Sequence, residues 1–389
     1  MIDRISRQDC CGCAACRQVC PRKCITMEED AEGFLYPVVD KSACVNCGLC
    51  EKVCPVFGEI RQHGEVEAYA AYSSRDAIRQ SSSSGGLFTP IAEQVIQSGG
   101  VVFGAAFDSD FSVHHVKVDT LEGLGQLRGS KYLQSRVENA YIEAKQALET
   151  GQTVLFSGTA CQIAGLKGYL GKDYDNLLTV DVLCHGVPSP KLWREYLAEQ
   201  EKAHGAPVRN VAFRSKRTGW KNYCVRMEFQ NGAAYQRRFD QDVYMRLFLS
   251  NICLRPSCHR CRFKDFPRVS DLTLGDCWGI ERTMPEMDDD QGTSVVILNS
   301  QKGRQVWQQI AAGCTWKANE LNILLPVAAD SRKSVLPHPN REKFFTALAQ
   351  GQDTGKLVKY IDPSLSATLK RKLRSGLRRV KRILSKIKP

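Results

Sequence analysis

Cysteine is the residue type whose number and spacing in this chain point most directly to chemistry. The sequence of 389 residues contains 18 cysteines, and ten of them fall between Cys10 and Cys54. Thiolates bind soft metal centres, and cysteines that bunch in this way indicate metal binding rather than disulfides. We therefore start from metal or cluster chemistry and ask which elements would position it.

Two motifs with the same spacing, Cys-x2-Cys-x2-Cys-x3-Cys-Pro, repeat in this region. The run is typical of ferredoxin-type proteins with two 4Fe–4S clusters, in which three thiolates bind one cluster and the fourth crosses to the other. The predicted ligands are Cys10, Cys13, Cys16 and Cys54 for cluster one, and Cys44, Cys47, Cys50 and Cys20 for cluster two. A pair of zinc knuckles is disfavoured, because zinc sites pair two cysteines at each end. Cys11 and Cys24 fall outside the spacing and are interpreted as small buried residues beside the clusters.

The rest of the chain predicts an α/β fold. From about Glu65 the pattern alternates between strands and helices, as in a layered domain. Strands are expected at residues 66–73, 101–107, 113–118, 153–157, 177–183 and 293–299, and helices at 86–97, 137–150, 160–170 and 190–204. Residues 208–239 predict a meander with a hairpin turn at Asn231-Gly232. The predicted organisation is a bacterial ferredoxin-like module (residues 1–60), a mixed α/β body (65–345) and a basic C-terminal helix (360–389).

Charge is concentrated in the C-terminal tail. The formal net charge is +12, and residues 370–388 carry ten basic and no acidic side chains, which leaves about +2 for the rest. Apolar residues recur in the tail at steps of three or four, so it predicts an interfacial helix on an anionic membrane, with a disordered tail as the alternative. The body lacks the interleaved basic and aromatic surface of a nucleic-acid-binding protein. With no apolar run long enough to span a membrane and no signal peptide, we expect a cytoplasmic protein, peripheral on the inner face of the cell membrane.

Five short segments occur in a characteristic order after the ferredoxin module: Ser83-Ser84-Gly85-Gly86, Gly129-Ser130-Lys131-Tyr132, Gly158-Thr159-Ala160-Cys161-Gln162, Cys184-His185-Gly186-Val187-Pro188-Ser189 and Cys258-x2-Cys261. Over about residues 65–340 this series resembles the coenzyme F420 (deazaflavin) hydrogenase/dehydrogenase beta-subunit family. The family often has proline where this chain has Ala160. The segment Gly275-Asp276-Cys277-Trp278-Gly279-Ile280 resembles a bacterial subgroup associated with polysaccharide biosynthesis.

The resemblance implies a flavin-binding body. It implies FAD near Ser83, Ser84, Gly85, Gly86, Gly129, Ser130, Lys131 and Tyr132; for this subgroup it does not by itself imply coenzyme F420. Small residues before a helix suit a phosphate, although a serine-rich helix cap is the alternative. Lys131 would place positive charge beside the flavin ring or a phosphate, or be a solvated lysine.

The resemblance also implies a third 4Fe–4S cluster, bound by Cys161, Cys184, Cys258 and Cys261. The first two follow predicted strands, whose carboxyl ends line the cofactor crevice of an open α/β sheet. Cys253 and Cys277 are reserve ligands by proximity in sequence, and a zinc site at Cys258 and Cys261 is an alternative. His185, beside Cys184, is either a proton shuttle or a structural histidine.

Taken together, these features predict a flavin-dependent iron–sulfur oxidoreductase. It would pass electrons between the ferredoxin-type clusters and a flavin-linked substrate, since a flavin converts between one-electron and two-electron steps. Its partners would be a redox protein or ferredoxin pool and a small-molecule or lipid-linked sugar substrate. The alternative is an electron-transfer subunit without its own substrate, serving a partner enzyme.

Overall fold

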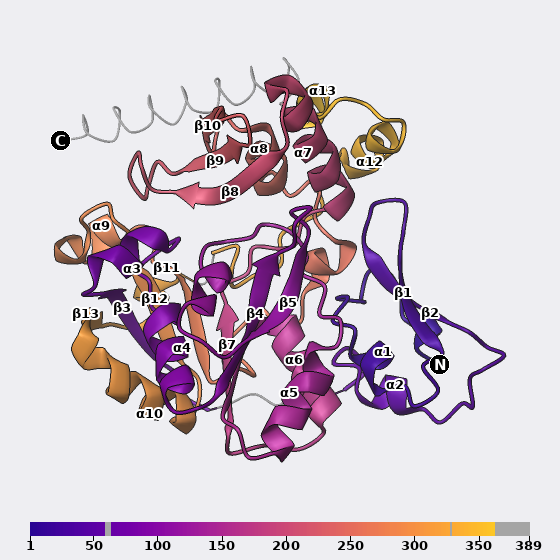
Figure 1. The fold of residues 1–389 in the computed structure, drawn as a ribbon, viewed down its shortest axis with the longest axis horizontal. Helices are drawn as coiled ribbons and strands as arrows, with labels where there is room; N and C mark the ends of the chain where they lie inside the picture. Colours follow the sequence, from indigo (N-terminus) through magenta and orange to yellow (C-terminus); the bar gives the residue numbers. More distant parts are fainter. Residues whose placement is uncertain (59–63, 327–328, 362–389) are drawn as a thin grey trace, which may run out of the picture.

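The structure is a computed structural model that describes residues 1–58, 64–326 and 329–361 (Figure 1). From residue 362 on, the predicted basic tail lies outside the described residues. Among the residues described, no helix has the length and apolar character needed to cross a membrane.

The ferredoxin module is a small unit at one side of the molecule (Figure 1). Its elements are η1 (Ile2–Arg4), α1 (Ala15–Val19), β1 (Ile25–Glu29), β2 (Leu35–Val39) and α2 (Leu49–Lys52). β1 and β2 form an antiparallel hairpin, in which Ile25 pairs with Val39. The cysteine motifs occupy the loops and short helices around this hairpin, so the hairpin sets the spacing between the two cluster regions.

The body is built on a mixed sheet of eight strands in the order β13-β3-β12-β11-β7-β6-β4-β5. The four strands β4, β6, β7 and β11 run parallel, and antiparallel strands extend the sheet on both sides. The strand bounds are β3 (Glu67–Ser73), β4 (Val101–Phe107), β5 (Val113–Val118), β6 (Val154–Thr159), β7 (Leu177–Val182), β11 (Leu272–Asp276), β12 (Ser294–Leu298) and β13 (Cys314–Ala318).

Helices cover both faces of this sheet, which explains the nearly continuous apolar runs of its central strands. In β4, Val101 and Phe103 pack with α5 and α6, whereas Val102 between them packs with α4 and α10. The helix bounds are α3 (Asp76–Ser81), α4 (Phe88–Gln97), α5 (Ala140–Glu149), α6 (Ala160–Leu170) and α10 (Gln301–Ile310).

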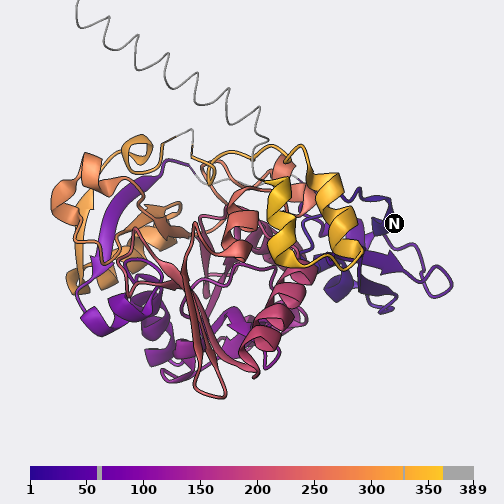
Figure 2. The same cartoon turned by 90° about the horizontal axis from the view of Figure 1, so that it is seen from above.

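A second, smaller sheet stands beside the large one, in the order β10-β9-β8. Its strands share an aromatic-rich core with α7, α8 and α12 (Figure 2). The bounds are α7 (Pro190–His204), β8 (Val208–Ser215), β9 (Cys224–Phe229), β10 (Ala234–Arg238), α8 (Val243–Leu249), α12 (Arg341–Ala349) and α13 (Thr354–Leu357). The remaining short elements are η2 (Gly123–Leu127), η3 (Pro256–Arg260), α9 (Ile280–Thr283), η4 (Pro285–Met287), η5 (Ala311–Gly313), α11 (Leu321–Leu324) and η6 (Val358–Tyr360).

The ferredoxin module packs closely on α6 through two glycines. A Cβ at Gly168 would lie 2.3 Å from the carbonyl oxygen of Val53, and one at Gly165 would lie 2.8 Å from Cys13 Cβ. Real Cβ atoms do not approach other atoms so closely, so glycine at both positions brings the backbone of α6 against the cluster loops. The two predicted domains therefore share an interface that includes a predicted cluster ligand.

The α/β prediction is confirmed, and most expected elements agree with the structure to within a few residues. No element was expected at α3, α8, β11 or β13. β11 is a short strand that reaches its place between β7 and β12 only through tertiary pairing. β13 is an edge strand whose residues are largely exposed, so it lacks the apolar pattern that marks a buried strand.

Candidate functional site

The first group of cysteines surrounds a small space inside the ferredoxin module. Its members are the four predicted by the crossover rule, each 7% exposed: Cys10, Cys13, Cys16 and Cys54. α1 positions Cys16, and Ala14 at its N-cap turns the chain through a left-handed conformation (φ 59°). Burial raises the pKa of the Cys16 thiol, and Cys10 and Cys54 raise it further. Each thiol of this group disfavours the ionisation of its neighbours, because thiolates repel one another. A bound iron–sulfur cluster removes this cost, since its iron compensates the negative charge of the thiolates.

The second group lies beside α2, at the end of the module away from the body. Cys20 joins Cys44, Cys47 and Cys50 around a cavity of about 180 Å³, again as the crossover predicts. Cys47 is exposed, so this is the cluster region that is open to solvent. Cys24 lines the same cavity, with its Sγ 3.4 Å from that of Cys20. Cys24 is buried, as expected, and it faces the cluster region.

The third group lines a cavity of about 820 Å³ in the body. Its members come from α6, the loop after β7 and the segment around η3: Cys161, Cys184, Cys258 and Cys261. Burial is the main cause that raises the pKa of Cys184 to about 12, and the nearby Cys161 is the second. The same two causes raise the pKa of Cys261 to about 11. A capping box between Thr159 and Gln162 begins α6 and fixes the turn that carries Cys161. The tertiary structure thus gathers four thiols that are up to a hundred residues apart.

The reserve ligands lie elsewhere. Cys253 is fully buried in the aromatic core of the second sheet. Cys277 is 1% exposed, and its Sγ lies 3.8 Å from the carbonyl oxygen of Leu324. Neither side chain lines the large cavity. The geometry therefore favours the set that includes Cys161 and Cys184.

The three groups differ from sites for a single metal ion. Among residues 1–58, 64–326 and 329–361, no group of three or more His, Cys, Asp or Glu side chains is arranged around one ion. Single-ion zinc sites use such compact tetrahedral groups, whereas a cubane of iron and sulfide keeps its four thiolates apart. Each of the three groups supplies four thiols, which is the donor set of a 4Fe–4S cubane.

The two segments expected near a flavin meet in the wall of the same cavity. Ser83 Oγ accepts hydrogen bonds from the backbone N–H of Ser130 (2.7 Å) and from its hydroxyl (2.9 Å). The predicted residues that line the cavity are Ser83, Ser84, Gly86, Gly129, Ser130, Lys131 and Tyr132. These segments share a wall with the third cysteine group, although they are far apart in sequence.

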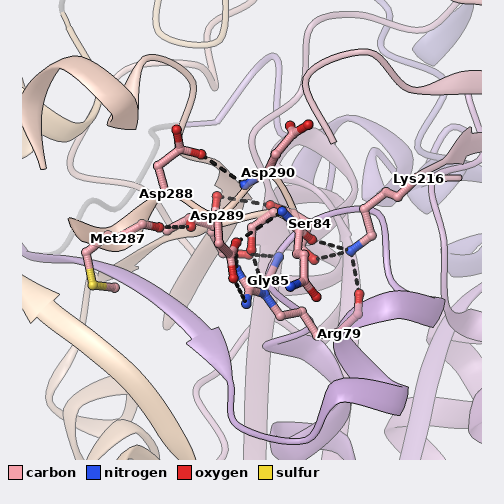
Figure 3. Close-up of polar contacts among 12 residues, drawn as sticks. Arg79, Ser84, Gly85, Lys216, Met287, Asp288, Asp289 and Asp290 are labelled. Atoms are coloured by element: carbon pink, nitrogen blue, oxygen red, sulfur yellow. Dashed lines mark hydrogen bonds and ion pairs between the residues drawn. The ribbon is translucent and has the colours of Figure 1, made fainter. Parts of the chain in front are cut away.

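A network of polar contacts fixes the serine-rich loop from behind (Figure 3). Lys216 donates hydrogen bonds from Nζ to the carbonyl oxygens of Arg79, Ser84 and Gln291. The guanidinium of Arg79 is paired with both carboxylate oxygens of Asp289, at 2.7 and 2.6 Å. The loop is thus anchored to the segment before β12, so its cavity-facing atoms are positioned before any ligand binds.

Gly85 is a correction to the predicted site. Its N–H donates to Ser294 Oγ (3.0 Å), and a Cβ built on it would lie 2.5 Å from the carbonyl oxygen of Ala71. Gly85 does not line the cavity. This position requires glycine because the loop passes close to strand β3, and not because a phosphate approaches it.

Lys131 is neither a solvated lysine nor a free cation aimed at a ligand. Its Nζ donates to the carbonyl oxygens of Gln126 (2.8 Å), Arg128 (2.9 Å) and Gly129 (3.4 Å). Burial lowers the pKa of this ammonium group to about 7. Lys131 therefore closes the loop after η2 and stabilises the turn that places Gly129 and Ser130 in the cavity wall.

Arg214 on β8 is a functional candidate that the sequence did not single out. Its guanidinium pairs with Asp276 (2.8 Å) and donates to Tyr132 Oη (3.1 Å) and to the carbonyl oxygen of Ser83 (3.3 Å). Its Nε is buried and has no acceptor among the described residues. Arg214 thus connects both flavin-type segments and leaves one donor for a bound group. The sequence signal was faint, since a charged residue in a strand is usually solvent-facing.

Trp278 forms an aromatic wall of the same cavity. It stacks on the buried Trp220, with ring centroids 4.4 Å apart and an interplanar angle of 4°, and remains 47% exposed. Trp278 and Asp276 both belong to the segment Gly275–Ile280, whose resemblance to a bacterial subgroup stays a prediction. That segment contributes side chains to the site, which its sequence pattern alone did not reveal.

Two histidines also line the cavity. His115 is buried, with Nδ1 2.7 Å from Ser135 Oγ and Nε2 3.0 Å from the carbonyl oxygen of Ser157. The sequence reading missed it, because it lies within a strand. Burial, followed by the charge of Lys264, lowers the pKa of His185. His185 is thus favoured in its neutral form, and its role as a proton shuttle remains a prediction.

His115 predicts a pH dependence of stability. Burial lowers its pKa to about 4, from 6.5, so the folded protein keeps it neutral while the unfolded chain takes up a proton below pH 6.5. Stability should therefore be lost as pH falls from 6.5 to 4, by about 3 kcal/mol from this group, at 1.36 kcal/mol per pKa unit. We expect His115→Gln to flatten this part of the curve of unfolding midpoint against pH. His204→Gln, at the end of α7, is the control. Identical pH slopes for His115→Gln and the wild type would contradict the assignment.

Comparison with known proteins agrees with the two-part organisation. Residues 9–57 match the family model of the 4Fe–4S dicluster domain, and residues 151–322 match that of the C-terminal part of the coenzyme F420 hydrogenase/dehydrogenase beta subunit. None of the curated proteins compared with the chain matches it. Among solved structures, a chain of the F420-reducing [NiFe] hydrogenase complex from Methanosarcina barkeri, studied by xenon derivatization, is similar at 16% identity and a TM-score of 0.43. That match covers 77% of this chain and 92% of the other.

The match to the beta-subunit model runs from β6 through β13 and includes all four thiols of the third group. The match to the dicluster model spans both four-cysteine motifs of the ferredoxin module. The chain therefore joins a region that matches the 4Fe–4S dicluster domain to a body that matches, over residues 151–322, the C-terminal part of the coenzyme F420 hydrogenase/dehydrogenase beta subunit.

Proposed function

We propose that this protein is an iron–sulfur flavoprotein oxidoreductase that passes electrons between its ferredoxin-type clusters and a flavin-linked substrate. The observation that carries this proposal is the composition of one cavity. A single space of about 820 Å³ is lined by four gathered thiols and by the two loop segments around Ser83 and Ser130. A cluster and a flavin bound there would be neighbours, which short-range electron transfer requires.

The residues present fit a flavin. The cavity volume lies in the range of small-molecule and cofactor sites, roughly 300–1,000 Å³. Its loops are fixed from behind by Lys216 and Arg79, and Arg214 offers a buried donor without an acceptor among the described residues. A bound flavin supplies the exchange between single electrons and electron pairs. The chain's own part is to position that group, to exclude water with its apolar wall and to leave Trp278 at an exposed edge.

The positions of the three cysteine groups support an order in which electrons pass through them. The group around Cys47 is exposed and is farthest from the body, so we propose that a redox partner protein docks there. Arg22 lines that cavity, and Lys23 and Lys52 nearby are exposed, which favours a partner with an acidic surface. The group around Cys13 lies against α6, and the third group lines the cavity.

The substrate class that we propose is a sugar or polysaccharide precursor, carried on a lipid or free. This proposal rests on the subgroup resemblance of the segment that contains Asp276 and Trp278, both of which line the cavity. The alternative function is an electron-transfer subunit that serves a partner enzyme, and the match to a beta-subunit family favours it. Turnover of a small-molecule acceptor by the isolated protein distinguishes the two.

Cofactor extraction from anaerobically purified full-length protein tests the proposal. We expect FAD at about one per chain in the wild type, and spectroscopy of the extract distinguishes it from a deazaflavin. Arg214→Met should release the flavin but retain the iron of the ferredoxin module, because the cysteines of that module lie outside the large cavity except for Cys11. Arg226→Met, on the neighbouring strand β9 and paired with Glu228, is the matched control and should retain both. Wild-type protein with full iron content and no flavin would overturn the flavoprotein reading.

A further inference from the structure

A fully buried arginine forms the junction between the ferredoxin module and the large cavity. Arg255 is 0% exposed, and it lies three residues before Cys258, whose N–H donates to the Arg255 carbonyl oxygen (2.9 Å). Its guanidinium reaches out of the body into the ferredoxin module. Nε donates to the carbonyl oxygen of Cys10 (2.8 Å), and Nη2 lies 3.7 Å from the Sγ of the same residue.

The other contacts of this guanidinium are also neutral. Nη2 donates to the carbonyl oxygen of Leu35 (2.9 Å), and Nη1 donates to Gln134 Oε1 (2.9 Å). The guanidinium carbon lies 4.2 Å from the ring centroid of Tyr36. None of these hydrogen bonds goes to a carboxylate in the described part of the chain. A buried cation without a counterion is costly, so the arrangement requires negative charge from another source.

Both cysteine groups can supply that charge. Cys10 is a predicted ligand of cluster one, and its sulfur lies next to the guanidinium. On the cavity side, Arg255 lines the wall of the large cavity together with Cys161 and Cys258. The arginine therefore contacts a thiol of the first group and shares the cavity wall with the third. It is also tied to Cys11 through Gln134, whose Nε2 donates to the Cys11 carbonyl oxygen (3.2 Å).

We infer that Arg255 is the shared countercharge of cluster one and the third cysteine group, and that it stabilises the reduced state of cluster one. Reduction adds a negative charge to an iron–sulfur cluster. A buried cation and a hydrogen bond to a ligand sulfur favour that added charge and raise the reduction potential. The inference goes beyond the proposed function, because it requires neither a flavin nor a substrate and rests on the dicluster domain.

A redox titration of cluster one, followed by electron paramagnetic resonance of the full-length protein, tests this inference. Arg255→Met removes the charge and keeps much of the apolar volume. We expect its midpoint potential to fall by an amount that corresponds to about tenfold in the reduction equilibrium, or about 59 mV for one electron. Arg255→Lys keeps a cation but cannot make all the bonds of the guanidinium, so its potential should fall between those of Arg255→Met and the wild type.

Arg194→Met is the matched control, because Arg194 also joins the body to the ferredoxin module, through Glu29, but is about half exposed. Its cluster potentials should equal those of the wild type. Iron content measured on every sample confirms that cluster one is present. An unchanged potential in iron-loaded Arg255→Met overturns the inference. If that variant does not retain cluster one, Arg255→Lys decides alone, and an unchanged potential in it overturns the inference as well.

Discussion

Replacing Cys184 with alanine is expected to remove the third cluster and leave the ferredoxin pair intact. Iron content should fall from about twelve to about eight atoms per chain, since each cubane holds four. The reason is geometric: Cys184 is one of only four cysteines that the described structure gathers at the third site, apart from Cys11 at its border. Cys161→Ala should have the same result. The clusters of the ferredoxin module should persist because their ligands lie in a separate part of the chain.

Electron paramagnetic resonance of the reduced proteins, together with iron analysis, measures this effect. Cys277→Ala is the control, because Cys277 is a cysteine of the same body but is fully buried outside the cavity. It should retain all three signals. Full iron content in both Cys161→Ala and Cys184→Ala would transfer the ligand role to other cysteines, with Cys253 and Cys277 as the first to examine. If the wild type itself contains about eight iron atoms, the third site is not a cluster.

Arg268→Met is expected to give the largest loss of stability, about 3–5 kcal/mol, because it removes one partner of a fully buried ion pair. Arg268 Nη1 lies 3.3 Å from both carboxylate oxygens of Asp181, and the two side chains are 1% and 0% exposed. Arg268 also donates to the carbonyl oxygens of Lys264 and Ser331. It therefore connects the end of β7, just before Cys184, to the segment after Cys261, and its loss should also weaken the third site.

The pH dependence identifies the cause of this loss. Burial raises the pKa of Asp181 even though Arg268 opposes it, so without the arginine the carboxyl should take up a proton readily. The destabilisation of Arg268→Met should thus be smaller near pH 5 than near pH 8, where a buried carboxylate without a partner is costly. Thermal unfolding of the holoprotein at both pH values measures it.

Two control variants separate charge from packing in this experiment. Arg268→Met/Asp181→Leu removes both charges, and should recover much of the stability because a buried ion pair contributes little over apolar packing. Arg194→Met, in an exposed ion pair, should cost about 0–1 kcal/mol. If the double variant is as unstable as Arg268→Met alone, the loss arises from the hydrogen bonds to Lys264 and Ser331, and not from the unpaired charge of Asp181.

Local features of the sequence were sufficient to predict most of the elements and the membership of the first two cysteine groups. The spacing Cys-x2-Cys-x2-Cys-x3-Cys brings three thiols onto one short turn, so the pattern carries its own geometry. The helix at Ala160–Leu170 was predicted to the residue, because a capping threonine and a glycine at its end mark both termini. The strands around it were predicted because they are short apolar runs between turn residues.

Tertiary structure decided whatever depends on residues that are distant in sequence. Cys253 is close to Cys258 along the chain but does not line the cavity, whereas Cys161 is distant in sequence and lines the same cavity as Cys258. Gly85 was expected to face a ligand, yet it faces strand β3. A glycine in the sequence can indicate that there is no room for a side chain. Only the folded structure shows which neighbouring residue occupies that space.

The charged residues gave the least information in the sequence. Lys131, Arg214, Arg255 and Arg268 have the same chemistry as any surface cation, and nothing local marks them as buried. Their burial depends on acceptors supplied by other segments, such as Asp276 for Arg214 and the Cys10 carbonyl oxygen for Arg255. The sequence by itself determined which cysteines of the ferredoxin module can bind iron–sulfur clusters, because the spacing of these ligands is a local property of the chain. Tertiary structure decided which charges surround them, because the compensation of a buried charge is a property of the whole fold.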